Sequence, residues 1–130
     1  MGLQERKVIE RVQNEELPSF NQRLLEYTSS PILFELDRES FQTNLDACFY
    51  LSGFLNTVAN AVEWVSRQPV GKQALAEGIN RIAIRNVADP AEKRCMIQDK
   101  VWYIDSVLSS TDSECRFGDS ELIKYLEENL

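Results

Sequence analysis

The sequence predicts a single α+β domain over residues 1–130, in which helices pack mainly on one face of an antiparallel sheet. Apolar residues recur every three or four positions in several stretches, which is the spacing of amphipathic helices. Over 32–37 and 81–108 they instead alternate with polar residues, which is the spacing of strands. A chain of 130 residues can bury one hydrophobic core, and no repeat or linker divides it.

The first helical stretch covers residues 3–27 and contains a proline. Pro18 has no backbone N–H and disfavours helical geometry in the residue before it. We therefore expect a kink, or two helices that meet at Glu16 and Leu17. The segment "SSP" at 29–31 then ends the helix.

Strands are expected in two places. The segment "ILFELD" predicts a short strand near 32–37. Farther along, "RIAIRNV", "RCMIQ" and "VWYIDSVL" are separated by the turn-forming segments "ADPAEK" and "DK". This order predicts a three-stranded antiparallel meander over 81–108, with a helix over 94–108 as the alternative.

The longest apolar stretch, "ACFYLSGFLNTVANAVEWV", is expected to be the central helix of the core, over about 44–67. It is not expected to span a membrane, because Asn56, Asn60 and Glu63 interrupt the roughly twenty apolar residues that spanning needs. Its polar residues fall on one stripe that would meet water. They are Asp46, Gly53, Asn56, Asn60, Glu63 and Arg67.

Two shorter helices complete the prediction. Residues 69–78 follow a proline and end at a glycine, a pattern typical of a short helix. The closing helix starts either at 112, after a segment that resembles a capping box, or only at 119.

Charge and composition exclude several classes of function. Fourteen basic residues against twenty-one acidic ones give a net charge of −7, which repels nucleic acids and anionic membranes and favours a basic protein partner. The chain contains no histidine, so Ser-His and Cys-His nucleophile pairs and the usual zinc sites are absent. We predict no cofactor, no metal site and no catalytic residue.

The three cysteines and the N-terminal segment indicate the compartment. Cys48, Cys95 and Cys115 are widely spaced and form no Cys-x-x-Cys motif, so they are interpreted as free, mostly buried thiols. The segment "MGLQERKVIERVQ" has charges where a signal peptide needs an apolar run. A cytoplasmic protein is expected.

The first candidate site is the face of the sheet that points away from the helices. Alternation turns polar side chains of the strands outward, where they could bind a carboxylate or phosphate ester, with one of the acids as acid-base group. An array of solvated cross-strand ion pairs is the alternative interpretation. These ligand-binding candidates are Arg81, Arg85, Tyr103, Asp105 and Glu35.

The same face carries Val101, Tyr103 and Val107, which is more apolar surface than a solvated sheet needs. It could form a homodimer through the meander.

The second candidate is a pocket beside the helix over 44–67. Aromatic and amide side chains suit a mostly apolar ligand pocket, although aromatic residues at helical spacing more often belong to the core. The pocket candidates are Tyr50, Asn56, Asn60 and Trp64.

Five segments in this order suggest a wider relationship: "LQERKVIERVQNEELP", "GKQAL", "RIAIRNV", a hairpin with Trp and Tyr, and "LIKYLEENL". Together they resemble a group of small, uncharacterised bacterial proteins with no assigned activity. The resemblance implies a bacterial, cytoplasmic, single-domain α+β protein, and it transfers no catalytic residue.

From the residues alone, we expect a small acidic domain, not an enzyme, that binds or regulates another protein and acts as a homodimer. The alternative is a small-molecule binder or a carboxylate-dependent enzyme that uses the outward sheet face or the pocket beside the central helix.

Overall fold

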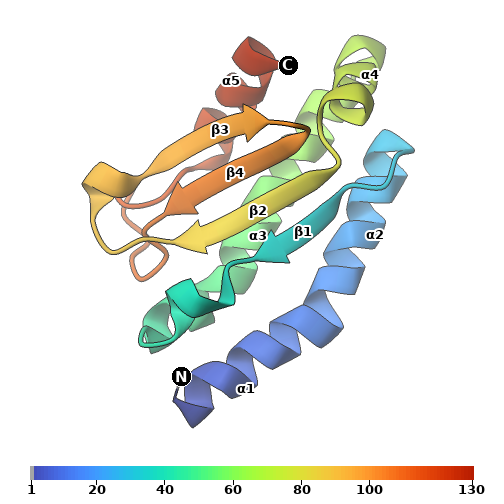
Figure 1. The fold of residues 1–130 in the computed structure, drawn as a ribbon. Coiled ribbons are helices and arrows are strands. Elements are labelled where there is room, and N and C mark those ends of the chain that lie inside the picture. The colour runs from blue at the N-terminus through green and yellow to red at the C-terminus, as the bar shows by residue number, and fades with distance from the viewer. Residues whose placement is uncertain (1) are drawn as a thin grey trace.

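A computed structural model describes residues 2–130 and confirms an α+β architecture of one helical layer against one sheet (Figure 1). The helices lie together on one side of the sheet, and the opposite side is open. In chain order the elements are α1 (Leu3–Arg11), α2 (Leu17–Thr28), β1 (Leu33–Leu36), α3 (Leu45–Ser66), α4 (Pro69–Gly78), β2 (Arg81–Asn86), β3 (Arg94–Gln98), β4 (Val101–Ser106) and α5 (Asp119–Asn129).

The prediction of an antiparallel sheet is wrong, because the sheet is mixed. Its strand order is β1-β2-β4-β3. Strand β1 runs parallel to β2, and β2 runs parallel to β4, whereas β3 and β4 are antiparallel. The predicted meander over 81–108 is therefore wrong too, since β4 inserts between β2 and β3.

The two connections of the predicted meander explain the difference. Asp99 and Lys100 have φ angles of 53° and 65°, and such left-handed pairs form the tight turns of β-hairpins. The connection from β2 to β3 is longer and contains a short 3-10 helix, Pro90–Glu92, capped by Asp89. It is not a hairpin, so β3 can lie at the sheet edge and leave the place beside β2 to β4.

The expected break in the N-terminal helix is confirmed. A π-helical turn over Val12–Glu16 separates α1 from α2, which begins at Leu17 with Pro18 in its first turn. The first turn of an α-helix does not use its backbone N–H groups within the helix, so a proline there costs no hydrogen bond. The break therefore places Pro18 where its missing donor is harmless.

The central helix is confirmed as α3, which lies between α2 and α5 in the helical layer (Figure 1). Its N-terminus is capped by Asn44, whose Oδ1 accepts a hydrogen bond from the Ala47 N–H at 3.0 Å. The predicted polar stripe is exposed throughout, apart from the half-buried Glu63. No helix in residues 2–130 has the length and apolar character needed to cross a bilayer.

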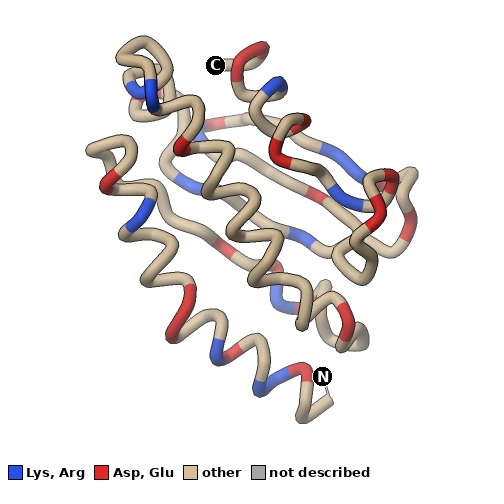
Figure 2. The backbone as a smooth tube through the Cα atoms, turned by 180° about the vertical axis from the view of Figure 1, so that it is seen from behind, with Lys and Arg blue, Asp and Glu red and all other residues tan. Residues whose placement is uncertain are grey.

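The helical side of the molecule is acidic. Helices α3 and α5 contain six acidic residues and one basic residue, Lys124. Figure 2 shows α5 in the foreground, with acidic positions along most of its length. The acidic residues are Asp46, Glu63, Asp119, Glu121, Glu127 and Glu128. Helix α5 begins at Asp119, so the later of the two predicted starts is confirmed.

Alternation along the strands separates the core from the open face. Ile82 and Ile84 of β2 and Trp102 and Ile104 of β4 are buried against the helices. At the β1 edge of the sheet, the Phe34 N–H points away from β2 and donates a hydrogen bond of 2.9 Å to Oδ1 of Asn21 in α2.

Candidate functional site

The open side of the sheet, called the outer face below, presents outward side chains in three rows. The rows follow from the strand register. Each row runs in the strand order β1, β2, β4, β3. The first row consists of Leu33, Arg81, Val101 and Gln98, and the middle row consists of Glu35, Ala83, Tyr103 and Met96. The third row, called the charged row, consists of Asp37, Arg85, Asp105 and Arg94. Asp37 follows β1 and extends its pairing, since its N–H donates to the Ile84 carbonyl at 2.9 Å.

All five predicted ligand-binding residues belong to this face. Arg81 and Glu35 form an ion pair between β2 and β1. Arg85, Tyr103 and Asp105 lie side by side on β2 and β4. Strand alternation was sufficient to bring these residues together in the prediction, even though the predicted strand order was wrong.

The predicted apolar contribution of Val107 to the outer face is not observed. Val107 lies beyond the end of β4, is buried, and donates its N–H to the Cys115 carbonyl at 2.8 Å. Val101 and Tyr103 do lie on the outer face, where Tyr103 is 37% exposed.

The carboxylate of Asp105 is the electrostatic centre of the charged row. Asp105 is only 5% exposed. The guanidinium groups of Arg85 and Arg94 approach its Oδ2 from both sides, each at 3.6 Å. A buried carboxylate needs such partners, because an unpaired charge away from water is costly.

The prediction missed Arg94, although the sequence contained a signal for it. A two-residue turn at Asp99 and Lys100 fixes the register of the hairpin, and counting outward from the turn places Arg94 directly opposite Asp105. The hairpin register, more than the strand order, therefore identifies this residue.

A hollow lies over Ala83 in the middle row, because Ala83 is much smaller than its neighbours Glu35 and Tyr103. It has a volume of about 380 Å³. We call it the Ala83 hollow. Its walls are formed by Glu35, Leu36, Asp37, Ile84, Arg85, Arg94, Tyr103 and Asp105.

The arginines beside the hollow keep free hydrogen-bonding capacity. Among residues 2–130, the guanidinium groups of Arg85 and Arg94 donate no hydrogen bond to a protein acceptor, and their 3.6 Å contacts with Asp105 are longer than hydrogen bonds. A guanidinium carries five N–H donors and binds carboxylate or phosphate in a bidentate manner. The charged row could therefore accept a further anionic group.

The second predicted candidate lies on α3, away from the sheet. Tyr50 and Trp64 are 42% and 53% exposed. The side-chain oxygens of Asn56 and Asn60 accept hydrogen bonds from Arg23 of α2, at 2.9 and 3.3 Å. Of these four residues, Trp64 alone lines one of three cavities, of about 300, 380 and 430 Å³, in residues 2–130. Arg23, which the prediction did not include, joins the two amides to α2.

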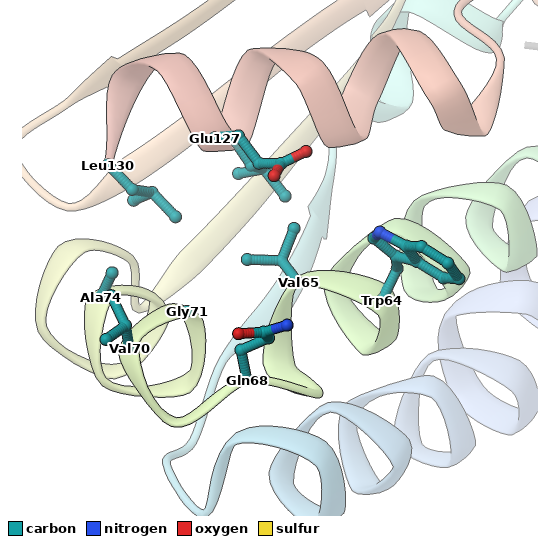
Figure 3. A pocket seen from close by; sticks show the side chains of 9 residues that line it. Trp64, Val65, Gln68, Val70, Gly71, Ala74, Glu127 and Leu130 are labelled. Atoms are coloured by element: carbon teal, nitrogen blue, oxygen red, sulfur yellow. The ribbon is translucent and has the colours of Figure 1, made fainter.

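Trp64 belongs to a separate groove of about 430 Å³ between the ends of α3, α4 and α5. In Figure 3, Trp64 lies at one end of the groove, and Val70, Ala74 and Leu130 lie at the other. Glu127 is the charged residue of its lining. The Arg67 guanidinium stacks over the Trp64 ring at 4.7 Å from its centroid.

The thiols do not form a reactive site with one another. Burial raises the pKa of Cys48 to about 11 and that of Cys95 to about 12. Cys115 lies in the loop before α5. In residues 2–130, no group of three or more Cys, Asp or Glu side chains is arranged to hold a metal ion.

The raised thiol pKa values predict slow alkylation in the folded state. At pH 8, a thiol with a pKa of 11 has about 100-fold less thiolate than one at the ordinary 9.0. Iodoacetamide should therefore modify Cys48 and Cys95 at least about 100-fold more slowly in native protein than in urea, as read by peptide mass spectrometry. Equal rates in both conditions would contradict their burial.

The same thiols should make the fold less stable at alkaline pH. Their pKa values are raised on folding, so the unfolded chain loses these protons first as the pH rises from about 9 towards 11. Their contribution to stability is thus complete below pH 9 and is lost above it.

No family model, curated protein or solved structure matches this chain.

Proposed function

We propose that this chain is a small, acidic, non-enzymatic interaction domain that acts as a homodimer through its outer face. The observation that carries the proposal is the open side of a largely parallel sheet. Strands β1, β2 and β4 are parallel, and parallel sheets in proteins are almost always covered on both faces. Here the described helices cover one face, and a second protein surface would cover the other.

The composition of the outer face supports such a cover. Its apolar side chains are Leu33, Ala83, Val101, Tyr103 and Met96, and the most exposed of them are Leu33 at 46% and Tyr103 at 37%. The charged row lies along one end of this apolar surface, and the ion pair of Arg81 with Glu35 lies within it. Protein interfaces commonly combine apolar and aromatic side chains with such charged groups.

The distribution of charge favours a second copy as the partner. The outer face carries three basic and three acidic residues, so its net charge is zero, whereas the whole chain carries −7. Two copies therefore meet no net repulsion at this face, while their helical sides repel one another. The six charged residues are Glu35, Asp37, Asp105, Arg81, Arg85 and Arg94.

The size of the face predicts a weak, reversible dimer. Four strands about 4.8 Å apart and five residues long give an area of roughly 19 by 17 Å. Such an area, roughly 320 Å² on each copy, is smaller than the roughly 800 Å² that each partner buries in a standard stable interface, so association should be weak. The dimer should therefore dissociate on dilution.

Light scattering across a concentration series tests the proposal. We expect the mass to rise towards twice the 15.0 kDa of one chain as the concentration increases. Val101→Arg, which places a second cation beside Arg81 among the apolar side chains of the outer face, should remain a monomer. Val70→Arg on the exposed part of α4, where Val70 is 82% exposed, is the matched control and should behave as wild type. A wild-type mass of 15.0 kDa at every concentration would refute the homodimer.

A second candidate function is binding of a small carboxylate or phosphate compound in the Ala83 hollow. The free N–H donors of Arg85 and Arg94 beside the hollow favour it. Isothermal titration with succinate and with inorganic phosphate tests this candidate. Heat that is lost in Arg94→Ala would support it, and no heat with wild-type protein would exclude these two ligands.

A basic protein is the partner that the rest of the surface favours. The acidic residues of α3 and α5 would attract it to the helical side, leaving the outer face free for dimerisation. Such a partner would give the dimer a regulatory role.

A further inference from the structure

We propose that two copies stack their outer faces about a two-fold axis that runs parallel to the strands between β2 and β4. Tyr103 of each protomer then enters the Ala83 hollow of the other. This inference rests on the proposed homodimer and specifies its geometry. It follows from the order of side chains in the three rows of the outer face.

The axis determines which strands meet. A half-turn about a line parallel to the strands keeps each row at its own height and reverses the order of strands within it. Strand β2 then lies opposite the partner's β4, and β1 lies opposite the partner's β3. An interface with this symmetry is isologous, so each contact occurs twice.

The middle row is complementary in shape under this rotation. Ala83, the smallest side chain of the row, lies opposite the partner's Tyr103, the largest. The hollow of about 380 Å³ over Ala83 provides room for the phenol ring. The two tyrosines lie on either side of the axis, close enough for the offset contact that aromatic pairs prefer.

The charged row is complementary in sign. From β1 to β3 it alternates as Asp37, Arg85, Asp105 and Arg94. When the order is reversed, Asp37 lies opposite the partner's Arg94, and Arg85 lies opposite the partner's Asp105. Each charge meets its opposite. The unused N–H donors of both arginines thereby gain carboxylate acceptors.

The other two-fold axis in the plane of the interface does not give complementary sizes and charges. An axis perpendicular to the strands would place β2 opposite the partner's β2 and reverse the order of the rows. Arg81 would then face the partner's Arg85, and Tyr103 would face the partner's Tyr103. Like charges and two large side chains in opposition destabilise an interface.

Sheet twist limits how many rows can align. Stacked sheets cross at about 30°, so contacts near the axis stay in register and those at the sheet edges shift. The Ala83 and Tyr103 contact lies nearest the axis and is the sharpest place to test the geometry. The contact of Asp37 with the partner's Arg94 lies at the edge, where the long side chain of arginine has to span the shift.

The decisive experiment exchanges the large side chain of Tyr103, called the knob, with the small side chain of Ala83, which leaves the hollow. By sedimentation equilibrium, Tyr103→Ala, which removes the knob, and Ala83→Tyr, which fills the hollow, should each weaken dimerisation at least about tenfold. The double variant Ala83→Tyr with Tyr103→Ala moves the knob to β2 and the hollow to β4. It should restore dimerisation to within about threefold of wild type.

A charge exchange gives an independent test. Asp37→Arg and Arg94→Asp should each dimerise more weakly than wild type, because each places like charges opposite one another. An equimolar mixture of the two should form heterodimers in native mass spectrometry, because their altered positions then attract. Thermal melts of each variant monitor the fold. A mixture that remains monomeric would count against the proposed axis.

The outcomes separate this inference from the proposed function. If the two single exchanges at positions 83 and 103 weaken dimerisation but the double variant does not restore it, the outer face is the interface and the axis is wrong. If wild type dimerises and both single variants dimerise equally well, the outer face is not the interface and both proposals fail. A wild-type chain that never dimerises also refutes both.

Discussion

Trp102→Ala is expected to lower the free energy of unfolding by about 3–5 kcal/mol, as large aromatic truncations in cores do. Trp102 has no exposed surface and belongs to β4, the second central strand of the sheet. Its ring stacks on Tyr125 of α5 at 6.3 Å between centroids and 2° between planes. The truncation removes the contact between sheet and helix as well as buried area.

Urea denaturation followed by circular dichroism measures this loss. Trp64→Ala is the matched control, because it removes the other tryptophan of the chain at a position that is 53% exposed. It should change the free energy of unfolding by no more than about 0.5 kcal/mol. Similar losses for both variants would mean that the packing of Trp102 is not what stabilises the sheet.

Leu55→Ala is expected to cost about 2–4 kcal/mol, and Val58→Ala somewhat less, because the valine loses fewer buried atoms. Both side chains are fully buried on α3. That helix contacts α2, α4 and α5, and its buried side chains belong to the same core as those of the sheet, so a cavity there has little freedom to collapse.

The same denaturation assay serves for α3. Thr57→Ala, at a position between the two buried ones, removes an exposed hydroxyl that donates to the Gly53 carbonyl at 3.1 Å. Its effect should stay within about 0.5 kcal/mol. If Leu55→Ala were as mild as Thr57→Ala, α3 would not be the central helix of the core.

Sequence periodicity predicted the features that depend on local spacing. The polar stripe of α3 and the outward direction of Arg81, Arg85 and Tyr103 follow from periods of 3.6 and 2 residues. The break in the N-terminal helix follows from the local chemistry of Pro18. These features do not depend on which strands are neighbours. They were therefore predictable without knowledge of the topology.

Strand order was not predictable in the same way. It depends on how the connection after β2 folds, and the 3-10 turn capped by Asp89 looks in sequence like an ordinary hairpin loop. The charged row and the Ala83 hollow depend on strand order, because they combine side chains from β1, β2, β4 and β3. Arg94 follows from the hairpin register, whereas the position of Asp37 beside Arg85 requires that β1 be placed next to β2.

The bond between Asn21 and Phe34 has a consequence for aggregation. Edge strands with unpaired N–H groups can recruit strands from other molecules and start open-ended fibres. At β1, the Asn21 side chain occupies an N–H that an incoming strand would otherwise bind. Growth of the sheet at this edge is thereby obstructed. Addition of a strand at β1 is therefore disfavoured, whereas stacking of two outer faces about a two-fold axis closes after two copies.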